Sequence, residues 1–149
     1  MLATQHIYIS QGAEAAVAVY RKHIRSMKGQ LTRLASRTTV VFKLLDDLRR
    51  ANKPNAEIAV NSRSNYGLYN KVVVEELAGT GVIIWDSTLP LSRVYTVYCE
   101  TYPRNTPPMN HWKCGDAGHV GYILVDQYAD MIINDYCNKY FNLGKNYCI

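Results

Sequence analysis

A chain of 149 residues with 48% apolar and 19% charged residues is long enough for one domain with its own core, and this composition excludes a disordered protein. The net charge of +5, from 17 Lys and Arg against 12 Asp and Glu, suits an acidic partner but does not require one. The sequence has no run of about 20 apolar residues and no basic and apolar leader, so we expect one domain over residues 1–149, without a membrane span, in the cytoplasm or in an unknown compartment.

The first third of the sequence predicts a strand, a long helix and a second strand. In Gln5 to Ser10, apolar and polar residues alternate, which is the two-residue period of a strand. From about Ala13 to Ala35 the apolar residues recur every three or four positions, which predicts a helix with one apolar stripe. Thr38 to Leu45 is rich in β-branched residues and is expected to be a strand.

The predicted long helix carries Arg21, Arg25 and Lys28 on a face of its own. Such a cationic face could contact nucleic acid, but no aromatic side chains that would stack on bases are interleaved with it. We interpret it as a solvated helix surface and do not expect nucleic acid as a partner.

The remaining two thirds predict a helix, a strand, a long loop and a last helix. Asn65 to Ala78 is expected to be helical and to end at Gly79-Thr80-Gly81, because glycine accepts the left-handed backbone found at helix C-termini. Val82 to Trp85 is a predicted buried strand. Ser87 to Gly118 holds four prolines and is interpreted as a loop, and loops of that length are uncommon unless they carry function. The last helix is expected from about Val120 to Tyr140.

Strands that alternate with helices are typical of an α/β fold in which helices cover both faces of a parallel sheet. We therefore expect a three-layer α/β sandwich with a small parallel sheet. Three strands make an incomplete sheet, because a parallel sheet needs cover on both faces and protected edges. We infer that an N-terminal βα unit, a partner chain that covers the open sheet, or both complete the fold.

The candidate catalytic residues lie where strands end and the last helix begins. Ligands of open α/β sheets bind beyond the carboxyl ends of the strands, and Asp86 directly follows the third predicted strand. Asp116-x-x-His119 precedes the last helix, and a carboxylate can hold one imidazole nitrogen while the other faces a nucleophile. Asp116 and His119 are therefore a candidate acid–base pair, although Asp116 could instead cap the last helix.

Several short motifs occur in a characteristic order. They are Tyr20-Arg21, Thr39 to Phe42, Tyr69-Asn70, Gly81 to Asp86, Asp116-x-x-His119 and Asn134 to Asn138. This ordered set resembles the SGNH (GDSL-like) hydrolases, above all their PC-esterase branch of glycan acyl-esterases and O-acetyltransferase-like domains. The resemblance implies a flavodoxin-like sheet that is incomplete at the N-terminus, with Asp116 and His119 as the catalytic acid and base.

The nucleophile of that family is missing from this sequence. The family's serine stands in a Gly-Asp-Ser element, which does not occur here, and Ser10 is a poor copy of it. Gln11 and Glu14 stand where the resemblance implies an oxyanion-hole donor. We therefore expect a truncated or degenerate acyl-esterase domain that is inactive alone and has a structural or interaction role. The alternative is an active serine acyl-esterase or O-acetyltransferase that acts on an acylated glycan when an N-terminal part completes it.

The remaining expectations concern ligands. Tyr95 and Tyr98, like Tyr102, could stack on a sugar or line a protein interface, and Asn70 and Asp86 are further candidate binding residues. No cofactor and no metal are expected, because the zinc-type ligands lack a second closely spaced pair. These ligands are Cys99, His111, Cys114 and His119. The cysteines are either free thiols or form the pairs Cys99–Cys114 and Cys137–Cys148.

Overall fold

The computed structural model describes residues 2–46, 63–101 and 122–140, and all structural statements concern these residues. Along them two helices come first, a strand–helix–strand unit follows, and two helices come last. The elements are α1 (Leu2–Gln11), α2 (Ala13–Ala35), β1 (Val41–Lys43), α4 (Arg63–Leu77), β2 (Ile83–Trp85), α5 (Thr88–Thr101) and α6 (Tyr122–Tyr140).

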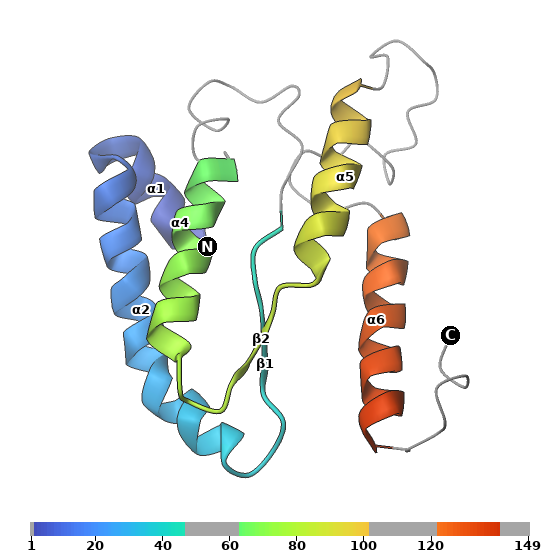
Figure 1. Cartoon of the computed structure of the whole chain (residues 1–149). Coiled ribbons are helices and arrows are strands. Elements are labelled where there is room, and N and C mark those ends of the chain that lie inside the picture. The colour runs from blue at the N-terminus through green and yellow to red at the C-terminus, as the bar shows by residue number, and fades with distance from the viewer. Residues whose placement is uncertain (1, 47–62, 102–121, 141–149) are drawn as a thin grey trace.

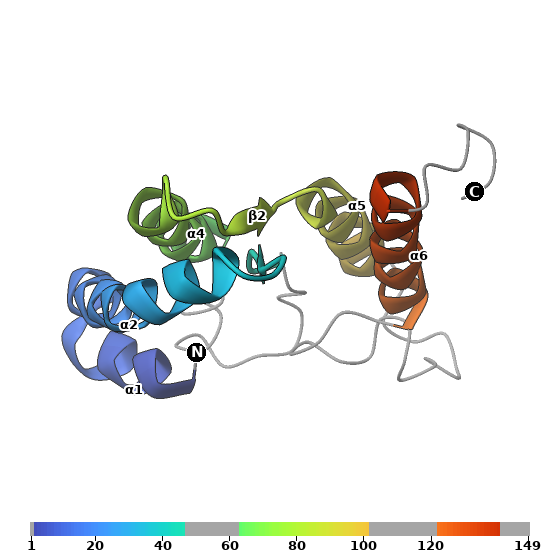
Figure 2. The ribbon, with the colours of Figure 1, turned by 90° about the horizontal axis from the view of Figure 1, so that it is seen from below.

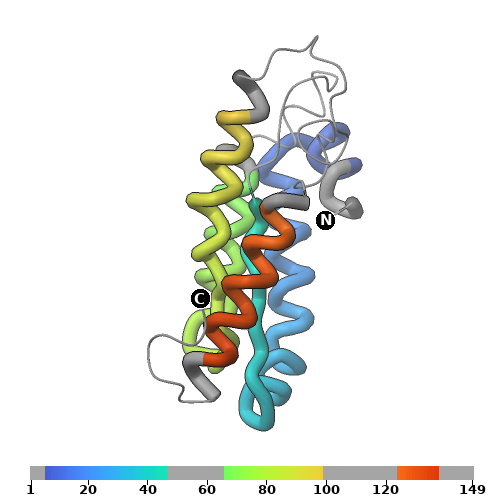
Figure 3. Tube along the Cα trace, turned by 90° about the vertical axis from the view of Figure 1, so that its right-hand side faces the viewer, coloured from blue at the N-terminus to red at the C-terminus, as the bar shows by residue number. Residues whose placement is uncertain are grey.

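Two groups of helices lie on opposite sides of two short strands. Helices α1, α2 and α4 form one group, and α5 and α6 form the other (Figures 1 and 2). Figure 3 shows α6 in front of both strands, with α2 and α4 behind them. Helix α2 packs against both α1 and α4, whereas α5 and α6 make far fewer contacts with each other.

The expected three-layer α/β sandwich is wrong, because the described part is mostly helical and holds one sheet of two three-residue strands. The strands are parallel, with Val41 opposite Ile83 and Lys43 opposite Trp85. Helix α4 joins them, so the alternation correctly predicted one βαβ unit. The three-layer fold failed as a prediction because residues 5–10, expected to be a strand, are helical.

Helix α1 forms because its side chains find a helical packing partner. Ile7 and Tyr8 pack against a cluster formed by Ala16, Tyr66 and Tyr69. The alternation of apolar and polar residues over so short a segment favours a strand only weakly, and this tertiary contact overrides that preference. Gly12 follows with a φ of 88°, a conformation that suits glycine, and it turns the chain from α1 into α2.

The main apolar core lies between α2, α4 and one face of the sheet. Figure 1 shows these elements side by side. Complete burial of one large apolar side chain in this core contributes about 1.5–3 kcal/mol to the stability of the fold. The buried residues are Ile24, Leu44, Val72, Val73, Leu77 and Val82. After α4 the chain turns at Gly79 and Gly81, which have φ values of 70° and 79°, so the predicted helix end is confirmed.

Helix α5 occupies the start of the segment that was expected to be a loop. Pro90 stands in the first turn of α5, where a missing N–H does no harm, so it does not prevent the helix. The buried face of α5 is polar: Thr88, Ser92 and Thr96 follow one another at four-residue spacing. Val94, in contrast, is 70% exposed, and Val97 and Tyr98 are exposed as well.

Candidate functional site

The candidate acid–base pair Asp116 and His119 lies outside the described residues, as do Tyr102, His111 and Cys114. Cys137, half-buried on α6, is a free thiol. Among the residues with described side chains, no group of three or more His, Cys, Asp or Glu could hold a metal ion.

Four predicted binding residues fall within the described part, but it does not bring them together. Asp86 is exposed, and its carbonyl accepts a hydrogen bond from the Leu89 N–H (2.9 Å) at the start of α5. Tyr95 is half-buried and Tyr98 is exposed, both on α5. Asn70 is buried on α4, in the other helix group.

Asn70 fixes the end of β1. Its side-chain oxygen accepts a hydrogen bond from the Leu45 N–H (2.8 Å), and its side-chain amide donates to the Leu45 carbonyl (2.9 Å). These bonds satisfy both backbone groups of Leu45 where the strand has ended. This gives Asn70 a structural task, and its part in ligand binding stays a prediction.

A polar cluster lies at the carboxyl ends of the two strands. We call it the strand-end cluster. It consists of Lys43, Asp46, Trp85, Thr88 and Tyr128. The Asp46 carboxylate forms an ion pair with the Lys43 ammonium and accepts a hydrogen bond from the Thr88 hydroxyl (3.0 Å). Since Asp46 follows β1 and Thr88 begins α5 just after β2, these bonds hold α5 to the end of the sheet.

Aromatic rings complete the strand-end cluster. The Lys43 ammonium lies 4.9 Å from the ring centre of Tyr128 and 5.9 Å from that of Trp85. The two rings meet edge to face, with centres 6.1 Å apart. Cation–π contacts of this kind attach α6 to the strands.

The groups of the strand-end cluster bind one another, and Trp85 alone among them also lines a described hollow. The Tyr128 hydroxyl is buried near Asp46, but no described residue meets it with standard hydrogen-bond geometry. Burial, and next the nearby Asp46 charge, raise the pKa of Tyr128, so the phenol stays neutral. The cluster therefore acts as a clasp between strands and helices, and neither described hollow is lined by Lys43 or Asp46.

A hollow of about 420 Å³ lies between α6 and the adjacent face of the sheet. We call it the sheet groove. Val41 and Ile83, which face each other in the sheet, are 51% and 42% exposed there. The groove is lined by Val41, Ile83, Trp85, Ser87, Met131, Ile132, Asn134 and Asp135. Its walls are mainly apolar, and sequence reasoning missed it because it depends on how closely α6 approaches the sheet.

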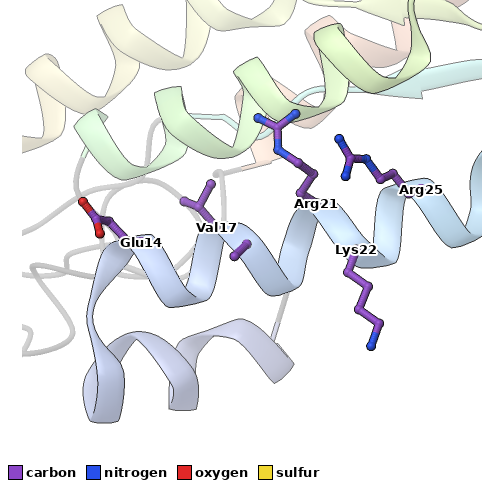
Figure 4. A pocket seen from close by; sticks show the side chains of 6 residues that line it. Glu14, Val17, Arg21, Lys22 and Arg25 are labelled. Atoms are coloured by element: carbon purple, nitrogen blue, oxygen red, sulfur yellow. The ribbon is translucent and has the colours of Figure 1, made fainter.

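A second hollow, of about 480 Å³, lies along α2 (Figure 4). Figure 4 shows Arg21 and Arg25 pointing toward α4 and Lys22 pointing away from it. Arg21 contacts Glu75 (2.7 Å) and Glu76 (2.6 Å), and Arg25 contacts Glu76 (2.9 Å).

These ion pairs change how the cationic face of α2 must be interpreted. The hydrogen bonds from Arg25 and Arg21 lower the pKa of Glu76 to about 2, so its carboxylate stays charged. Two of the three cations considered for nucleic-acid binding are thus neutralised by α4. These two arginines join α2 to α4. The edge-to-face contact of Tyr20 with Tyr69, whose ring centres are 5.0 Å apart, joins the same two helices.

Comparison with protein-family models, with curated proteins and with solved structures finds no match for this chain. The resemblance to the SGNH hydrolases therefore stays a prediction. None of the described helices has the length and apolar character needed to cross a bilayer.

Proposed function

We propose that this chain is a non-catalytic interaction module, a truncated or degenerate acyl-esterase-like domain whose sheet groove takes up an extended segment of another polypeptide. The observation that supports it is the exposed pair Val41 and Ile83, which lines the groove. Parallel strands are normally covered on both faces. A contiguous apolar surface of this kind marks a site of interaction.

The backbone of β1 favours a strand as the occupant. The Val40 carbonyl accepts a hydrogen bond from the Ile83 N–H (2.9 Å), and the Leu44 N–H donates to the Trp85 carbonyl (3.1 Å). Because peptide groups alternate in direction along a parallel strand, those of Val41 and Lys43 point toward the opposite edge of β1. Within the described ranges β2 alone pairs with β1, so this edge can bond to an added strand.

The lining of the sheet groove defines the side chains of that segment. Met131 and Ile132 of α6 face Val41 and Ile83 across the hollow, and Asn134 and Asp135 give it a polar border. An extended segment directs alternate side chains to one side. We therefore expect apolar residues at every second position and polar residues between them.

A photoreactive amino acid placed at Val41 tests this proposal in extracts of the native source. The matched control is the same group at Val74, an apolar residue of similar exposure on α4, outside the groove. The proposal expects adducts at position 41 that map to one extended segment with alternating apolar residues, and no such adducts at position 74. Equal labelling at both positions, or adducts at position 41 that map to unrelated segments, would contradict it.

The second candidate is an active acyl-esterase or O-acetyltransferase that an N-terminal part completes. What favours it is the parallel, adjacent pair β1 and β2, an arrangement whose carboxyl ends commonly form ligand sites. Ser10 is a poor nucleophile for it, since it lies in α1 and its hydroxyl donates to the His6 carbonyl (2.8 Å). A fluorophosphonate serine probe decides: labelling of the pure chain supports an esterase, and absence of labelling rules out activity of this chain alone.

A further inference from the structure

One flank of α6, which borders the sheet groove at Ile132, is apolar and exposed. Val125, Ala129, Ile132 and Tyr136 are all exposed and follow one another at steps of four, three and four. This spacing is that of the apolar seam of a coiled coil, where a second helix lies along the first. In soluble helices such a stripe ordinarily faces a partner.

One border of this seam is acidic. Asp126 and Asp130 are exposed and stand one turn apart beside Val125 and Ala129. In the whole chain, by contrast, Lys and Arg exceed Asp and Glu by five. Charge complementarity therefore favours a basic helix as the occupant of the α6 seam.

Helix α2 carries such a basic surface. Ala16, Met27 and Leu34 share one side of α2, because the spacings between Ala16 and the other two are close to whole helical turns. Ala16 is fully buried where α1 packs on the first half of α2. Beyond the end of α1, Met27 and Leu34 are 38% and 51% exposed.

The exposed half of α2 matches the α6 seam in spacing and in charge. Met27 and Leu34 are seven residues apart, as are Val125 and Ile132. Arg33, in the last turn of α2, and Arg37, two residues beyond its end, are exposed and give this end of α2 a basic border, opposite in charge to Asp126 and Asp130. Neither arginine is among those that α4 neutralises.

We propose that this protein self-associates, with the α6 seam of one copy lying on the exposed half of α2 of the next. The contact joins two different surfaces, so every copy in the assembly offers one of each, and growth can continue beyond a dimer. It does not rest on the strand docking proposed above, because only Ile132 among the seam residues also lines the sheet groove.

Charge reversal tests the self-association. One double variant carries D126K and D130K, and the other carries R33E and R37E. In each, the α6 border and the α2 border carry like charges. In an equimolar mixture, the lysine border of the first variant can pair with the glutamate border of the second. The aspartate border of the second can pair with the arginine border of the first. Sedimentation velocity over a concentration series, at low and high salt, measures the average mass.

We expect the wild-type mass to rise with concentration and to fall when salt is added, because the paired charges are exposed. Each double variant should associate at least tenfold more weakly, and mixing the two should restore the wild-type mass. Circular dichroism confirms that both variants are folded. V74T, at an exposed position of α4 outside both hollows, should associate like wild type. A wild type that is monomeric at every concentration overturns the proposal, as does a mixture that fails to reassemble.

Discussion

The helices on the two sides of the sheet are packed by different means. On one side, α2 and α4 enclose an apolar core that contains Ile24, Val73 and Leu77. On the other, the buried face of α5 consists of Thr88, Ser92 and Thr96, while its valines face solvent. The first group is stabilised by apolar burial. The second is attached to the sheet by polar and aromatic contacts and leaves apolar side chains exposed.

This difference has an energetic consequence. Apolar burial contributes about 25 cal/mol per Å², which adds up over a core of large side chains. A hydrogen bond contributes only about 0.5–1.5 kcal/mol net, because water makes such bonds as well. We therefore expect α5 and α6 to open locally at lower free energy than α2 and α4.

Replacing Leu77 with Ala should produce the largest loss of stability. Leu77 is almost fully buried in the core of the first group, so the variant loses apolar burial and leaves a cavity. We expect a cost of about 2–5 kcal/mol in the free energy of unfolding. The matched control is Val94→Ala in the second group, with a cost within about 0.5 kcal/mol. Urea denaturation measures both, and equal losses would refute the distinction between the two groups.

Asp46→Ala should detach the second group. The substitution removes the ion pair to Lys43 and the hydrogen bond to Thr88, and leaves the ammonium between aromatic rings without a counter-charge. We expect a loss of about 2–3 kcal/mol, below the cost of breaking a fully buried pair because Lys43 is partly exposed. Hydrogen exchange should speed up in α5 and α6 more than in α2. Uniform acceleration would contradict the role of a clasp.

The same contrast explains which elements the sequence could predict. Helix α2 matches its predicted range, because its apolar stripe is long and regular. Helices α4 and α6 and strand β2 were also predicted closely. Helix α5 was missed for two reasons: prolines were counted as evidence for a loop, and its buried hydroxyl residues carry no apolar period.

Only part of the strand-end cluster could be predicted from the sequence. The rule that ligands and polar groups gather at the carboxyl ends of strands pointed to Asp86, which is exposed. Applied to the strand predicted to end at Leu45, the same rule would have found Asp46. The contact of Asp46 with Thr88 and the approach of Tyr128 depend on how the strands pair and where α6 lies. A single sequence carries no signal for either.

Asn70→Ala should cost somewhat less than the loss of Asp46. It removes two hydrogen bonds and leaves the N–H and C=O of Leu45 without their partner at the edge of the core. We expect a loss of about 2 kcal/mol. Asn70→Asp, which keeps the acceptor but not the donor, should lie between Asn70→Ala and wild type. If Asn70→Ala is as stable as wild type, Asn70 has no structural task, and its predicted role in binding gains weight.

The smallest effect is expected from acid, and it concerns the junction of α2 with α4. The pKa of Glu76 is lowered from 4.5 to about 2 by its bonds to Arg25 and Arg21. The stabilisation from this carboxylate is therefore fully present above pH 4.5 and is lost as the pH falls toward 2. Arg25→Gln should raise the pKa of Glu76 and make stability fall less steeply across that window. Lys22→Gln, whose side chain points away from α4, should keep the wild-type slope (Figure 4). Thermal melts at a series of pH values measure this slope. Identical slopes for Arg25→Gln and wild type would show that the ion pair does not join the two helices in solution.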